Sequence, residues 1–169
     1  MFVFRCTKKL YQRIEPWAAP EREPPTSSTT KLGDWTANIV IIHRQHLVLA
    51  VSNVTLLPVL LPIAPSKTLI PRLTDAVGSV LRVLGIDQQR IVSELAAMGH
   101  CIVTGTNDRR VLGSMNDFVR MLDAYLDGRP LVEVALCLAE APCSPLGMAS
   151  PRRTTTALFT APALRLVKG

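Results

Sequence analysis

The chain has 169 residues, of which 48% are hydrophobic and 19% charged, so its composition is that of one globular domain and excludes wholesale disorder. The formal net charge is +6, and the excess of lysine and arginine lies largely at the two ends of the chain. Such basic ends are suited to binding nucleic acid or an acidic partner, or are simply solvated. We expect no signal peptide, because Lys8 and Lys9 follow the first apolar residues, and no membrane span, because the longest apolar stretch is the proline-containing segment 54–64. These features predict a cytoplasmic protein.

The N-terminal part of the chain predicts a short strand and a short helix. Residues 2–6 are typical of a strand, and residues 8–14 form a helix with Leu10 and Ile14 four positions apart on one face. The segment 15–34 is then a proline-rich loop without enough apolar surface to pack tightly.

A hairpin and a third strand follow. Residues 35–43 are apolar on both alternating faces, which predicts a central strand covered on both sides. Residues 47–51 should pair with it in antiparallel fashion across a connection of about three residues. A third strand is expected at residues 55–61, where Pro58 cannot donate a ladder hydrogen bond and therefore places the strand at an edge or a bulge.

The second half of the chain predicts four helices and one short strand. Pro71 suits a first helical turn, and Asp87 and Ser114 are suitable N-cap residues. We expect helices over about 70–84, 88–98, 115–127 and 131–139, and a strand over 100–105.

Strands that precede most of the helices indicate an α+β fold, an antiparallel sheet of about four strands with about four helices packed on it. A single domain should cover residues 1–146. The remainder, 147–169, is rich in proline, serine, threonine and arginine, and we expect a basic, poorly ordered tail there.

The cysteines do not indicate a metal site or a disulfide framework. None of the four belongs to a C-x-x-C pair, and the expected state is a buried, reduced thiol. Zinc could be held only if His43, His46 and His100 were gathered with Cys101, an arrangement that we disfavour. No cofactor is evident.

The most unusual segment is 104–117, which places two glycines, two adjacent arginines and two aspartates between a strand and a helix. Arg109 and Arg110 are suited to bind a phosphate or a carboxylate, and the start of the helix offers free backbone N–H groups. A purely structural interpretation is equally open. Ser114 and Asp117 resemble a capping box, and the arginines can pair with neighbouring acids.

We hypothesise that polar residues at the ends of several elements gather into one cationic, amide-rich recess that binds a phosphate-bearing ligand, nucleic acid or an acidic partner. The candidate ligand-binding residues are Lys8, Lys9, Asn38, Asn107, Arg109, Arg110, Ser114 and Asn116.

Two other classes of function remain open. A metal-dependent phosphoesterase or nuclease would use Asp108 and Asp117 to hold a divalent ion, although the chain contains no catalytic motif, so we lean towards a protein that is not an enzyme. Alternatively, small size and basic charge suit a protein–protein module of a toxin–antitoxin or mobile-element system.

Four pieces of the chain resemble an uncharacterised bacterial family, the domain of unknown function 6933. They are RCTKKL (5–10), LGDWTAN (32–38), TLLP (55–58) and RRVLGSMND (109–117). The resemblance extends over residues 1 to about 145 and implies a small, soluble, single-domain bacterial protein of unassigned activity. It implies no catalytic residues.

Overall fold

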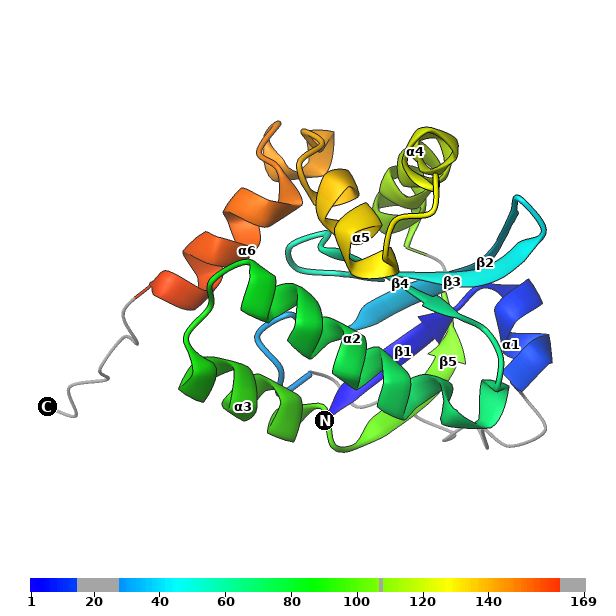
Figure 1. Ribbon diagram of the computed structural model, residues 1–169. Helices are drawn as coiled ribbons and strands as arrows, with labels where there is room; N and C mark the ends of the chain where they lie inside the picture. Colours follow the sequence, from blue (N-terminus) through cyan, green and yellow to red (C-terminus); the bar gives the residue numbers. More distant parts are fainter. Residues whose placement is uncertain (15–27, 107, 162–169) are drawn as a thin grey trace, which may run out of the picture.

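The computed structural model describes residues 1–14, 28–106 and 108–161, which form a five-stranded sheet with helices on both faces (Figure 1). The α+β class is therefore confirmed. The strands are β1 (Phe2–Cys6), β2 (Trp35–Ile42), β3 (Gln45–Ser52), β4 (Pro58–Pro62) and β5 (Cys101–Gly105), and the helices are α1 (Lys8–Ile14), α2 (Leu69–Val83), α3 (Gln88–Ala97), α4 (Arg109–Tyr125), α5 (Leu131–Ala139) and α6 (Pro151–Thr160).

The predicted hairpin and edge strand are both present. β2 and β3 pair in antiparallel fashion, joined by His43 and Arg44 alone, which have φ values of 46° and 62°. A two-residue turn with positive φ at both positions matches the twist of the strands, and it is tighter than the three residues expected. β4 lies at the edge of the sheet order β4-β3-β2-β1-β5, as Pro58 predicts.

The sheet is mixed, which corrects the expectation of a wholly antiparallel one. β1 is parallel both to β2 and to β5. The chain leaves β1 through α1 and must return to the same end before it enters β2, and such a crossover makes two adjacent strands parallel. The local pattern of β1 does not contain this information, because a strand has the same alternation in either orientation.

The two faces of the sheet are covered by different helices (Figure 1). On what we call the α2 face, Phe2 and Phe4 of β1 belong to a large apolar cluster with α2 and α3. On the opposite α4 face, a smaller cluster joins Leu49 of β3 to Val111 and Phe118 of α4. α5 contributes side chains to both clusters.

α4 begins at Arg109, six residues earlier than predicted. The Asp108 carboxylate accepts hydrogen bonds from the backbone N–H groups of Arg110 and Val111, at 3.0 and 3.3 Å, and is the N-cap. The prediction that Ser114 caps this helix is wrong. Ser114 lies within the helix, where its hydroxyl donates to the Arg110 carbonyl oxygen at 3.4 Å. By contrast, the predicted N-cap Asp87 is confirmed at the start of α3.

The chain after residue 146 does not match the expected poorly ordered tail. Ser150 caps α6, Pro151 occupies its first turn, and Phe159 is buried in the cluster of the α2 face. Thr155 donates a hydrogen bond to the Thr55 hydroxyl at 2.9 Å, which connects α6 to the turn before β4. The buried Phe159, the N-terminal cap and this hydrogen bond together hold the polar helix. The rest of the predicted tail, 162–169, and most of the predicted loop, 15–27, lie outside the described residues.

Candidate functional site

The ends of β1 and β5 bring some of the predicted site residues together. The Thr106 backbone N–H donates to the Cys6 carbonyl oxygen at 2.9 Å, so the chain leaves both strands side by side. The Thr7 hydroxyl donates to the Asn38 side-chain oxygen at 2.7 Å, which places Asn38 of β2 at the same end. The exposed Lys8 begins α1 there, and Asn107 is outside the described residues.

The helix N-terminus at this place is already occupied. Asp108 accepts from the free N–H groups of the first turn of α4, so its own carboxylate is the anion that the helix dipole stabilises. An external phosphate at this terminus would be repelled by that charge. Arg109, at the first position of α4, is exposed.

Arg110 is held by the polar network that crosses the α4 face. Its guanidinium donates to the Asn53 backbone carbonyl oxygen. The Asn53 backbone N–H in turn donates to the Asp34 carbonyl oxygen at 2.8 Å, and its side-chain oxygen accepts from the Thr36 hydroxyl at 2.8 Å. Residues of β2 and of the turn after β3 thereby position an arginine on a helix.

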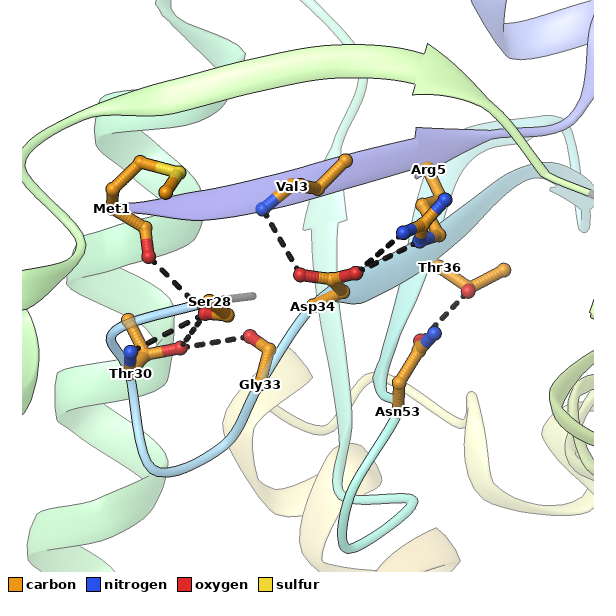
Figure 2. A network of polar contacts seen from close by, with 9 residues as sticks. All are labelled: Met1, Val3, Arg5, Ser28, Thr30, Gly33, Asp34, Thr36 and Asn53. Atoms are coloured by element: carbon orange, nitrogen blue, oxygen red, sulfur yellow. Dashed lines mark hydrogen bonds and ion pairs between the residues drawn. The ribbon is translucent and has the colours of Figure 1, made fainter. Parts of the chain in front are cut away.

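The same network contains an ion pair that the sequence reasoning did not single out (Figure 2). The Arg5 guanidinium donates twice to one carboxylate oxygen of Asp34, at 2.9 and 2.7 Å, and the Val3 backbone N–H donates to the other oxygen at 3.3 Å. Both side chains are largely buried, with 28% and 17% exposure. The only available signal was that Arg5 and Asp34 both stand in pieces that carry the family resemblance.

A groove of about 780 Å³ lies between α4 and the segment 141–148. Three of the predicted residues, Arg110, Ser114 and Asn116, line it. Asp117 also lines it and forms an ion pair with Arg120, one turn further along α4, at 3.2 Å. The groove therefore has two arginines, of which one is paired with a carboxylate and the other donates to a backbone carbonyl.

Most of the groove lining is apolar. Phe118 and Cys143 form buried parts of it, whereas Met148 is 63% exposed. Burial raises the pKa of the Cys143 thiol, and the nearby charge of Asp117 adds to the effect. The thiol is therefore protonated at neutral pH and is a packing group instead of a nucleophile. The sequence reasoning missed the segment 141–148, because its contact with α4 is tertiary.

The predicted single recess is divided between separate places. Lys9 lines a different hollow, together with Ile39 and Ile41 of β2, on the α2 face. Arg110 and Asn116 line the groove beside α4. The division arises because α1 packs on one face of the sheet, whereas α4 crosses to the other.

The two aspartates considered for an enzyme cannot share one metal ion. Asp108 is the N-cap of α4, and Asp117 lies nine residues further along the same helix, a rise of roughly 13 Å. Within residues 1–14, 28–106 and 108–161, no three His, Cys, Asp or Glu side chains are arranged to hold a metal ion.

The chain belongs to the family described as "Domain of unknown function (DUF6933)", whose model matches residues 3–154. The match continues past residue 145, the expected limit, into α6. Comparison with curated proteins and with solved structures finds no match. No single helix in the described part of the chain has the length and apolar character to cross a bilayer, although the bent pair Leu131–Ala139 and Ser144–Thr160 does by length and composition.

Proposed function

We propose that this protein is a non-enzymatic binding module, and that the groove beside α4 receives a ligand with an apolar body and a phosphate or similar anionic group. The observation that carries the proposal is the position of Arg110. It lines a mainly apolar groove, and its partner is a backbone carbonyl and not a carboxylate.

The size and lining of the groove support an amphipathic ligand. A groove of about 780 Å³ is within the range of roughly 300–1,000 Å³ that is typical of small-molecule sites. Met121, Pro142 and Met148 offer apolar surface, and methionine adapts to ligands of different shape. The anionic end of the ligand would lie at the polar side of the groove, near Ser114 and Asn116.

The two arginines should contribute unequally. Arg120 already forms an ion pair with Asp117, so an incoming anion would have to compete with this carboxylate. Arg110 has no carboxylate partner among the described residues. Its guanidinium also has further N–H groups beyond the one that donates to the Asn53 carbonyl oxygen. Asn53 also restricts the guanidinium, which lowers the entropic cost of binding.

The proposal can be tested with three matched small probes, hexyl phosphate, inorganic phosphate and 1-hexanol, by following the backbone amide signals of the full chain in NMR titrations. We expect hexyl phosphate to shift the amides of α4 and of residues 141–148. Its affinity should exceed that of either partial probe by about tenfold or more, because only it uses both parts of the groove.

A pair of arginine variants then identifies the anion contact. Arg110→Gln should weaken the binding of hexyl phosphate about tenfold, which corresponds to one charge-assisted contact, and should leave 1-hexanol unaffected. Arg120→Gln is the matched control, with a change of less than about threefold expected. Equal losses in both variants, or shifts by hexyl phosphate outside the groove, would contradict the proposal.

A further inference from the structure

A second hollow, of about 360 Å³, lies on the α2 face between α1 and the turn end of the β2–β3 hairpin. It is separate from the groove beside α4, because the two lie on opposite faces of the sheet. Ile39 and Ile41 of its wall point to the α2 face, whereas Val40 between them packs in the cluster beneath α4. The hollow is therefore available to a ligand whether or not the α4 groove is occupied.

One wall of the hollow is basic. Lys9 and Arg13 are four positions apart on α1, so their side chains lie on the same face of the helix, and both are exposed. Neither belongs to an ion pair within the described part of the chain, and no described acidic side chain lines the hollow. His46 of β3 adds a ring nitrogen opposite them. Among the described residues, no carboxylate balances the positive charge of this wall.

The other wall is apolar and partly open to solvent. Ile39, Ile41 and Ile63 line it, and Ile41 is 53% exposed, one of few large apolar side chains with so much free surface in the described chain. Ile41 is the register partner of His46, so its apolar surface lies directly beside the imidazole ring, and Lys9 and Arg13 line the same hollow. Exposed apolar surface surrounded by charge is typical of an interaction site.

We propose that this hollow binds an acidic segment of a partner protein, with one apolar side chain of the segment against the three isoleucines and flanking carboxylates beside Lys9 and Arg13. Charge complementarity and the apolar wall together favour this occupant. Nucleic acid phosphates would use the two cations but would leave the isoleucines without a partner, and among the described residues of the hollow His46 alone offers a ring on which a base could stack.

The test uses three capped tripeptides in NMR titrations of the full chain: Glu-Leu-Glu, Glu-Ser-Glu and Gln-Leu-Gln. The first has both the charge and the apolar side chain, and each of the others lacks one of them. We expect Glu-Leu-Glu to shift the amides of Lys9, Arg13 and Ile41. It should bind with a dissociation constant in the millimolar range, about tenfold more tightly than either of the other two peptides.

Variants separate the two contributions. Lys9→Ala combined with Arg13→Ala should weaken Glu-Leu-Glu about tenfold and leave Gln-Leu-Gln unchanged. Ile41→Ser should abolish the preference for leucine over serine without affecting Glu-Ser-Glu. The matched control is Arg82→Ala combined with Arg90→Ala, which removes two exposed cations outside the hollow and should change nothing. Preserved amide spectra show that each variant is folded.

Two kinds of result, one with the peptides and one with DNA, would overturn the proposal. The first is the absence of shifts around the hollow with Glu-Leu-Glu at about 10 mM, or equal binding of the leucine and serine peptides. The second is tighter binding of a short DNA duplex, with steep salt dependence and loss in the Lys9 and Arg13 variant, which would assign the hollow to nucleic acid. Because no probe or variant here concerns Arg110, failure of this proposal is distinguishable from failure of the α4 groove.

Discussion

The two faces of the sheet differ most clearly along β1. On the α2 face, Phe2 and Phe4 are fully buried under helices, and the cluster continues across every strand. On the α4 face, the same strand carries Arg5, and the neighbouring strand β5 carries Thr104, because α4 covers β2 and β3 instead. Apart from the buried Val3, β1 therefore has a polar, partly open surface on the α4 face and a fully buried apolar one on the α2 face. Substitutions of the aromatic and of the polar residues should have very different costs.

The largest difference is expected between an aromatic residue of the α2 face and a polar residue of the α4 face. Phe4→Ala should lower the free energy of unfolding by about 3–5 kcal/mol, since it leaves a cavity in the main cluster. Thr104→Ala, next to β1 on the other face, should change it by less than about 0.5 kcal/mol. Urea denaturation measures both, and similar losses would contradict the distinction between the faces.

Buried polar contacts should show the same asymmetry. Glu94 of α3 is 3% exposed and accepts from the backbone N–H groups of Lys31 and Leu32, each at 2.9 Å. Glu94→Ala should cost about 2–3 kcal/mol of unfolding free energy, because a buried amide loses a charged acceptor. Asp34→Asn, in the more open ion pair with Arg5, should cost about 1 kcal/mol. A larger loss for Asp34→Asn in chemical denaturation would reverse the comparison.

The thiols of the α2 face should make the fold sensitive to alkali. Burial raises the pKa of Cys101 from its ordinary value of 9.0 to about 12, and burial raises that of Cys6 as well. The folded state keeps these protons above pH 9 whereas the unfolded state loses them, so stability falls as the pH rises from about 9 towards 12. Each thiol contributes a slope of up to about 1.4 kcal/mol per pH unit.

Cys101→Ala should therefore make the loss of stability between about pH 9 and pH 11 shallower, as measured by the denaturation midpoint at each pH. Cys137→Ala, a substitution in α5 outside the sheet, is the control. An unchanged slope in the Cys101 variant would show that other groups determine the alkaline limit.

The smallest expected effect is a gain. The Thr106 hydroxyl oxygen is buried without a hydrogen-bond partner within the described chain, so Thr106→Val should raise the free energy of unfolding by about 1 kcal/mol. The matched Thr36→Val removes a hydroxyl that donates to Asn53 at 2.8 Å and should lower it by a similar amount. Calorimetry would show opposite shifts of Tm, and a loss of stability in the Thr106 variant would contradict this account.

Several elements were predictable because their signals are local. The alternation of β2, the proline of β4 and the Asp87 cap of α3 each depend on residues within one turn or strand. The start of α4 was missed because Asp108 and Ser114 are both suitable N-cap residues and lie close together in the sequence. Asp108 caps the helix, since its carboxylate accepts hydrogen bonds from two free N–H groups.

The candidate site was predictable in part for the same reason. Arg110 and Asn116 are conspicuous in the sequence and do line the groove. The apolar wall formed by residues 141–148 has no pattern of its own that indicates contact with α4, and the Arg5–Asp34 pair joins residues 29 positions apart.

By itself, the sequence determined the α+β class, most strands and helices, the edge position of β4 and membership of a family without assigned activity. The tertiary structure alone decided the parallel placement of β1, the ordered α6 and the separation of Lys9 from Arg110 on opposite faces. The physical reason is that propensity, capping and alternation act over a few residues, whereas the face on which a helix packs depends on crossovers that are set by burial across the whole chain.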